Sequence, residues 1–219
     1  VMYYNTTVDT KAFAEVPGME ITNIIAALNT EKDQSETIKA IEAMEQVRKT
    51  VYLDEVKIKL DGSDVSAYVM RDYGEKETRL VYEGRYPEKK NEIVLAGILS
   101  ERLEKTVGDT VEAGFGDKTE TFTITGLTNG SSMGGTNTCI LADDFKRLNP
   151  DFKPQSLYIY LNEGTETAAF IEKLEDKFDK ETVLSFSDFD KLMAEGMSSY
   201  QSIVAAMGLA MLVITLMVV

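Results

Sequence analysis

The most constraining feature of this 219-residue sequence is an uncharged run at its C-terminal end. No Asp, Glu, Lys or Arg follows Glu195, and a helix can satisfy the polar groups of the few interruptions internally. A helix that crosses a bilayer needs about 20 predominantly apolar residues. We therefore expect a membrane span, cut short by the end of the chain, that includes Ile203, Leu209, Leu212, Ile214 and Val219.

The alternative is a buried core helix, but no other segment is hydrophobic enough to surround a helix that is apolar on all sides. Ser187 and Asp190 form a capping-box pattern, so we expect one helix from Asp188 to Val219, about 48 Å long. That length exceeds the ~30 Å hydrocarbon thickness of a bilayer. The helix would therefore project from the membrane into the preceding domain as a stiff rod, with Gly196 as its weakest point.

Composition excludes several classes of protein. With 43% hydrophobic and 27% charged residues, the chain is typical of a globular fold. Its net charge of −14 argues against nucleic acid and against an anionic membrane surface as partners. Histidine is absent, which removes Ser-His-Asp and Cys-His catalysis, and the single cysteine, Cys139, excludes an intrachain disulfide and is expected to be buried. We expect no catalytic residue, cofactor site or metal site in this chain.

The first part of the chain predicts a strand, a helix and a hairpin. We expect a strand over Glu20–Leu28 and then a helix with Ser35 as its N-cap. Apolar residues that recur every three positions define the inward face of that helix, at Ile38, Ile41, Met44 and Val47. Alternating apolar residues on both sides of Asp61-Gly62 predict a strand-turn-strand hairpin.

From Arg79 the pattern changes to short strands separated by turn residues. The segment "ILSERLEK" predicts a short helix with Ile98, Leu99 and Leu103 inward, and "DDFKRLN" predicts a helical turn. A turn is expected at Gly116-Asp117. The strands of this part are expected in "EIVLA", "TVEAG", "ETFTITGL" and "TCILA".

The last part repeats the order strand, helix, strand, in "SLYIYLN", "EGTETAAFIEKLEDKF" and "ETVLSF", with Phe170, Leu174 and Phe178 on one helix face. Together the two ends predict an α+β fold: strand-helix-strand units from both chain ends form one sheet-and-helix subdomain, and a small β-rich subdomain is inserted between them. A long C-terminal helix that enters the membrane follows. The expected divisions are 1–79 with 150–187, an insertion at 80–149, and a stalk with a partial span at 188–219.

One stretch, "YEGRYPEKKNEIVLAGILSERLEKTVGDTVEAG", resembles the extracytoplasmic domain of FtsX-like, MacB-type ABC transporter permeases. The "FTITGL" strand and a membrane span after the domain follow in the order that this family shows. The resemblance is specific over about Leu80–Leu148. It rests on the order and spacing of short strand-and-turn motifs that are each common in proteins. The residues that carry the motif, which we expect to be structural, are Gly84, Arg85, Pro87, Glu92, Gly108 and Asp109.

The resemblance implies a permease subunit of the cell membrane whose globular domain is extracytoplasmic. Such a subunit forms a homodimer or heterodimer and works with a separate cytoplasmic ABC ATPase, which uses ATP. The resemblance also implies that movement passes through long helices to the outer domain. That domain then contacts a substrate or a partner protein in export, lipoprotein release, antimicrobial peptide resistance or the regulation of cell-wall hydrolases.

The sequence "NGSSMGGTN" predicts a surface loop, because it lacks the Lys-Ser/Thr that completes a phosphate-binding loop. We expect this loop to contact a partner or substrate through Asn129, Ser132, Met133 and Gly134. Two other functions stay open at this point. The first is a membrane-tethered extracellular binding or sensor domain without transport activity, and the second is a carboxylate-based hydrolase, although no pair of carboxylates stands out.

Overall fold

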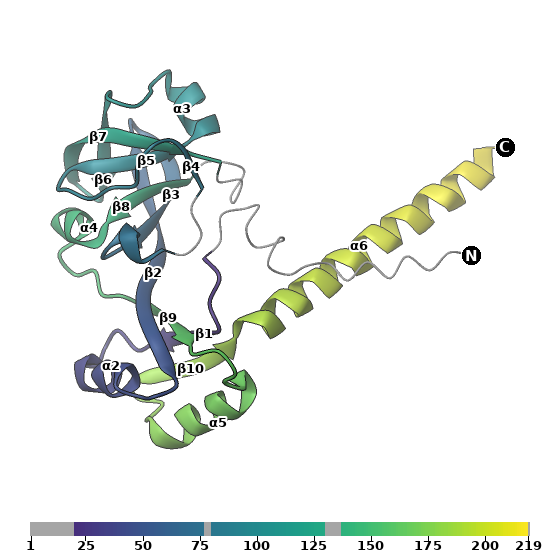
Figure 1. Cartoon of the computed structure of the whole chain (residues 1–219). Coiled ribbons are helices and arrows are strands. Elements are labelled where there is room, and N and C mark those ends of the chain that lie inside the picture. Colours follow the sequence, from purple (N-terminus) through teal and green to yellow (C-terminus); the bar gives the residue numbers. More distant parts are fainter. Residues whose placement is uncertain (1–19, 77–79, 130–136, 219) are drawn as a thin grey trace.

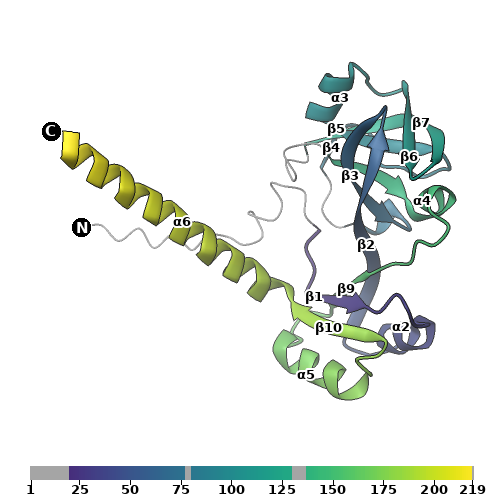
Figure 2. The same cartoon turned by 180° about the vertical axis from the view of Figure 1, so that it is seen from behind.

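The computed structural model describes residues 20–76, 80–129 and 137–218, except for the side chains of Tyr200, Val204, Leu209 and residues 212–218. The chain folds into a mixed α+β structure in which two lobes lie at opposite ends of a long strand (Figure 1). A single helix projects away from one of the lobes (Figure 2).

The sheet-and-helix lobe is built from both ends of the chain. Its antiparallel sheet has the order β10-β1-β9-β2, and two helices cover one face of it. These elements are β1 (Ile24–Leu28), α2 (Ser35–Glu42), the first half of β2 (Val47–Leu60), β9 (Ser156–Leu161), α5 (Thr167–Lys177) and β10 (Val183–Asp188). Every second residue of β1 points at the helices, so the alternation of the sequence produces the core between them: Ile24, Ala26, Leu28, Ile38, Ile41, Leu157, Ile159, Phe170 and Leu174.

The second lobe is a small closed barrel. Pairing runs from β2 to β3, β8, β5, β7 and β6 and then back to β2, through Lys59↔Gly114 and Leu60↔Ala113. Its elements are the second half of β2, β3 (Ser63–Met70), β5 (Glu92–Ala96), β6 (Thr110–Phe115), β7 (Lys118–Thr128) and β8 (Asn137–Leu141). The barrel lobe also contains η1 (Tyr73–Glu75), β4 (Val81–Gly84), α3 (Gly97–Leu103) and α4 (Ala142–Leu148). Ring closure leaves these strands with few exposed edges, and their inward side chains form one core.

Strand β2 joins the lobes, because it takes part in both sheets. Val47–Tyr52 pairs with β9, whereas Leu53–Leu60 pairs with β3. A third cluster of buried side chains lies where the lobes meet, and it contains Val51, Leu53, Met70, Tyr73, Val94, Cys139 and Tyr160. The barrel therefore draws β3 and half of β2 from the segment expected at 1–79, and the domain boundaries stay a prediction.

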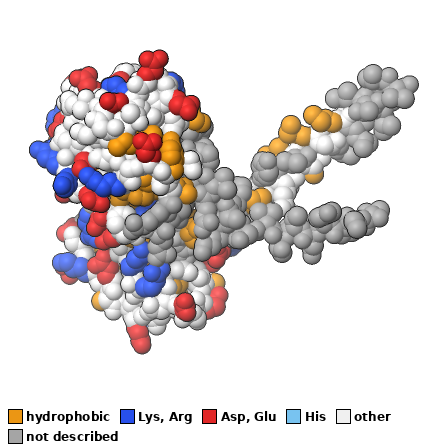
Figure 3. Space-filling model, turned by 45° about the horizontal axis from the view of Figure 1, so that its top comes forward, with side chains coloured by type: hydrophobic (Ala, Val, Ile, Leu, Met, Phe, Trp, Pro, Cys, Tyr) orange, Lys and Arg blue, Asp and Glu red, His pale blue; other side chains and the backbone are white. Residues whose placement is uncertain are grey.

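Helix α6 (Phe189–Val218) leaves the sheet-and-helix lobe directly from β10. Phe189 is 2% exposed and its backbone N–H donates to Asn23 O at 3.0 Å, so the first residue of the helix is fixed to the sheet. At 1.5 Å per residue the helix is about 45 Å long. Beyond Met197 its described apolar side chains are exposed, including Ile203, Met207 and Met211 (Figure 3).

Over the described part of the chain, no helix combines the length and the apolar character needed to cross a membrane.

The structure confirms the α+β class, the Asp61-Gly62 hairpin and the Gly116-Asp117 turn. The expected strand over Glu20–Leu28 is shorter, since pairing begins at Ile24. Ser35 is not the N-cap of α2 but its first residue, and its N–H donates to Asp33 Oδ1 at 2.9 Å.

Three further expectations about helices were wrong. Helix α2 ends at Glu42, so Val47 begins a strand instead of extending the helical face. Ile98 is not inward but 58% exposed, because the short helix α3 turns only Leu99 fully into the core. Ser187 does not cap the last helix, because it belongs to β10. Instead, Asp188 Oδ1 caps the first turn of α6 by accepting the backbone N–H of Lys191 at 3.0 Å.

Candidate functional site

The motif residues around Gly84 form a tight turn between β4 and β5. Gly84 has φ +72°, and a Cβ atom there would lie 2.1 Å from Thr125 O, so only glycine fits. The turn is held against β7 by Arg85 N, which donates to Thr125 O at 2.8 Å.

Arg85 and Glu92 clamp the two sides of this turn. The Arg85 guanidinium makes a bidentate ion pair with Glu92, at 2.5 Å from Nη2 to Oε1 and 2.7 Å from Nη1 to Oε2. Glu92 Oε2 also accepts the backbone N–H groups of Glu88 and Lys89, both at 2.9 Å. Arg85, followed by these backbone donors, lowers the pKa of Glu92 to about 2. Pro87 is buried within the turn.

Gly108 and Asp109 shape a second turn, in front of β6. Gly108 has φ +96°, and its N–H donates to Ile124 O at 2.9 Å. Ile124 N donates in return to Asp109 O at 2.8 Å, and Asp109 Oδ2 accepts from Thr106 N at 2.9 Å. In both turns the motif residues bind the chain's own backbone, which is a structural use of their chemistry.

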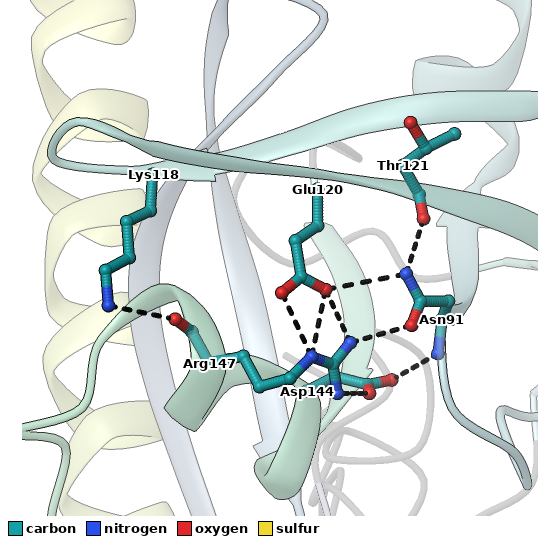
Figure 4. Close-up of polar contacts among 6 residues, drawn as sticks. All are labelled: Asn91, Lys118, Glu120, Thr121, Asp144 and Arg147. Carbon is teal, nitrogen blue, oxygen red and sulfur yellow. Dashed lines mark hydrogen bonds and ion pairs between the residues drawn. The ribbon is translucent and has the colours of Figure 1, made fainter.

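Sequence reasoning missed a polar network that ties Asn91, just before β5, and strand β7 to α4 (Figure 4). Arg147 contacts Glu120 at 2.6 Å, Asp144, and Asn91 Oδ1 at 2.8 Å. Asn91 has φ +61°, and it also donates through Nδ2 to Thr121 O at 2.7 Å and through its backbone N–H to Asp144 Oδ2 at 2.9 Å. Arg147 is the main cause of the lowered pKa of Glu120.

The second missed feature is a cavity of about 200 Å³ between the lobes. A buried ion pair lies in its wall, with 2.8 Å between Lys76 Nζ and Glu20 Oε2, and Tyr160 Oη donates to Glu20 Oε1 at 2.6 Å. The lining residues are Glu20, Leu53, Glu55, Tyr68, Met70, Tyr73, Lys76, Cys139, Ser156 and Tyr158. Because these residues come from β2, β3, η1, β8, β9 and the positions of Glu20 and Lys76 outside these elements, the sequence contains no local pattern that marks the cavity.

The remaining sites expected from the sequence are only partly described. Asn129 is exposed at the end of β7, whereas Ser132, Met133 and Gly134 lie outside the described residues. Ile203 is exposed on α6. The other residues expected in the span also lie outside the described part, either in their side chains or entirely: Leu209, Leu212, Ile214 and Val219.

Comparison of the sequence with models of protein families and with curated proteins gives no match. Comparison of the structure with solved structures gives several. The periplasmic region of MacB from Actinobacillus actinomycetemcomitans has a TM-score of 0.57 at 10% identity, and covers 80% of this chain and 93% of its own. The extracellular domain of the noncanonic ABC-type transporter YknZ from Gram-positive bacteria has a TM-score of 0.56 at 13% identity, and covers 77% of this chain and 99% of its own.

These likenesses define the fold. The chain has the fold of the periplasmic region of MacB and of the extracellular domain of YknZ over most of its length. The resemblance to MacB-type extracytoplasmic domains that the turn motifs of the sequence indicate is therefore confirmed as a likeness of fold.

Proposed function

We propose that this chain is the extracytoplasmic domain of an ABC transporter permease subunit. The observation that carries the proposal is the direct continuation of β10 into α6, in a domain with the fold of the MacB and YknZ outer domains. A recognition domain needs only a tether, whereas this helix is joined rigidly to the sheet at Phe189. In this function the chain transmits movement and binds a substrate or a partner protein, and it does not catalyse a reaction.

In this proposal α6 continues into the membrane. The support comes from the sequence, which has no charge after Glu195, and from the exposed apolar side chains of Ile203, Met207 and Met211. Apolar side chains in a row on a projecting helix gain free energy when lipid replaces water around them, by about 25 cal/mol per Å². The globular lobes then lie on the extracytoplasmic side.

The same helix is the element that would transmit movement. A separate cytoplasmic ABC ATPase binds and hydrolyses ATP, the permease dimer closes and opens, and α6 carries the displacement to the sheet-and-helix lobe. Strand β2, which pairs in both lobes, and the cluster of buried side chains where the lobes meet keep the two lobes together during this displacement. The barrel lobe, with the loop that begins at Asn129, contacts the substrate or the partner protein.

Transmission can be measured by pulsed electron spin resonance on the natural permease and its ATPase in nanodiscs. Spin labels at Ile98→Cys, which is exposed on α3, report the distance between the barrel lobes of the two subunits in the permease dimer. We expect ATP with vanadate to shift this distance. Insertion of two glycines between Ser198 and Ser199 should remove most of the shift, because a flexible joint within α6 cannot transmit a displacement from one end of the helix to the other.

The matched control inserts the same two glycines at the exposed Gly116-Asp117 turn, where the shift should persist. A shift that survives the insertion in α6, or the absence of any ATP-dependent shift in the natural protein, would contradict the proposal.

A further inference from the structure

Strand β10 forms an outer edge of the sheet. Within the described part of the chain β1 is the only strand that pairs with it. Phe189 N bonds to Asn23 O, and the register places Ser187 opposite Ile25. Because hydrogen-bonding groups alternate along an antiparallel strand, the backbone N–H and C=O of Phe186 point away from β1, as does the N–H of Asp188.

The two outer edges of the sheet differ in how they are protected against a further strand. The opposite end of the strand order is β4, which has four residues, contains Glu83 and ends at Gly84 with Arg85 and Pro87 close behind. Strand β10 has one irregularity, at Leu184, but its pairing with β1 is regular over residues 185–188, and it carries no charge or proline before Asp188. Charges, proline and bulges prevent a further strand from adding to an edge, so the regular part of β10 after Leu184 is the part that can accept one.

A groove of about 330 Å³ lies directly on this edge, between α5 and the first turns of α6. Its apolar lining comes from Ala168, Ile171, Phe186 and Leu192. On the same strand, the side chain of Leu184 is 56% exposed. An exposed backbone edge with an apolar groove beside it matches the way that extended peptides bind sheets, with backbone hydrogen bonds and one side chain in a pocket.

The charges around the groove determine the kind of segment that fits. Asp188 and Glu195 contribute two carboxylates to the lining and Lys191 one ammonium group. The whole chain has a net charge of −14, so a second copy would bring like charge to the same edge. We propose that β10 binds an extended, basic segment of a partner protein as an added strand, with an apolar side chain of that segment in the groove.

This inference holds for the chain whether or not it serves a transporter. The test uses the full chain in a neutral detergent and the peptide acetyl-Lys-Val-Lys-Leu-Lys-Val-Lys-amide. We expect binding by calorimetry, and slower hydrogen exchange at the amides of Phe186 and Asp188. The amides of Ser185 and Ser187 already face β1 and should change little.

Two substitutions locate the site. Leu184→Lys places a cation beside the edge and should weaken binding by about tenfold, which corresponds to about 1.4 kcal/mol. Ile98→Lys is the matched control, because Ile98 is 58% exposed on the other lobe, and it should leave affinity within about twofold of the parent. The same peptide with proline in place of both valines should not bind, because it lacks two N–H donors.

Three results would overturn the proposal. The first is no binding, or binding that the proline peptide reproduces. The second is equal binding of the peptide with glutamate in place of lysine, which would contradict the basic partner. The third is protection of the Phe186 and Asp188 amides that grows with protein concentration in the absence of peptide, which would show that a second copy of this chain occupies the edge.

Discussion

At the scale of single residues, backbone conformation explains why glycine occupies its positions in the turn motifs. Gly84 and Gly62 share a left-handed φ, at +72° and +82°, but their surroundings differ. At Gly84 the backbone of Thr125 and Gly126 occupies the space of a side chain, whereas nothing lies within 4 Å of a Cβ atom at Gly62. A glycine in the sequence shows that a turn is present, but it does not reveal this close approach of two strands.

We predict that Gly84→Ala lowers the free energy of unfolding by more than 3 kcal/mol, or prevents folding, because strain and a backbone collision add together. Gly62→Ala carries only the conformational cost and should lower it by about 1–2 kcal/mol. Urea denaturation of both variants measures the difference. Equal losses would show that the contact with β7 is unimportant.

The negative charge of Asp54 lowers the stability of the fold, because this carboxyl group is buried. It is 6% exposed in β2, where the strand passes from one lobe to the other. Its Oδ1 accepts the N–H groups of Gln155 and Ser156 at 2.9 and 3.0 Å, while Oδ2 is buried without a partner among the described residues. Burial raises the pKa of Asp54 to about 6 in spite of these two donors.

Because the pKa of Asp54 is higher in the folded chain than in the unfolded chain, the folded chain binds more protons between about pH 4 and pH 6. The contribution of Asp54 to stability is therefore greatest below this window and is lost as the pH rises through it. Asp54→Asn keeps the Oδ1 acceptor and removes the charge, so it should stabilise the chain at pH 7 by about 1–2 kcal/mol.

Thermal unfolding of Asp54→Asn and of the parent at pH 4 and pH 7 checks this expectation. The gain should be present at pH 7 and largely absent at pH 4. Asp64→Asn is the control, since its side chain is 81% exposed, and its effect should be small at both values. A gain that does not depend on pH would mean that Asp54 is not the titrating group.

At the scale of elements, strands and turns followed from the sequence more fully than helix ends did. The alternation around Asp61-Gly62 predicted the hairpin because side chains on one face of a strand repeat every two residues. The spacing of Val47 fitted a helix as well as a strand, and tertiary pairing with β9 decided between them. Likewise Ser187 fitted an N-cap, but pairing with Ile25 keeps it in β10 and leaves capping to Asp188.

The joint between β10 and α6 leads to a prediction for this element. Phe189 is 2% exposed, so Phe189→Ala should cost about 3–5 kcal/mol. Leu192→Ala, in the same helix but 41% exposed, should cost less than about 1 kcal/mol. Denaturation measures both losses, and hydrogen exchange of the β10 amides should increase only in the first variant. A small loss at Phe189 would show that α6 is not fixed to the sheet.

At the scale of the whole molecule, the sequence predicted the α+β class, a sheet built from both ends of the chain, and the likeness to MacB-type domains. It did not predict the closed barrel, because ring closure rests on two residue pairs between β2 and β6 that are far apart in sequence. The Arg147 network and the cavity between the lobes escaped prediction for the same reason. Their partners come from different strands and helices and meet only after folding.

In the function that we propose, the lobes stand outside the membrane on a helix that enters it. Single cysteines at Ile98, Ser198 and Met211 place a reporter on the barrel, on the exposed first part of α6 and in its apolar part. The native Cys139 adds little background, because it is 5% exposed and burial raises its pKa to about 11.

The decisive measurement is labelling by a membrane-impermeant maleimide in intact cells that produce the full natural protein. We expect rapid labelling at Ile98→Cys and Ser198→Cys. We expect Met211→Cys to be protected, because lipid surrounds this part of α6. In the detergent-free chain, where Met211 is 67% exposed, the same cysteine should react. Equal labelling of all three positions in intact cells, or labelling of Ile98→Cys only after the cells are broken, would show that α6 does not hold the lobes outside the membrane.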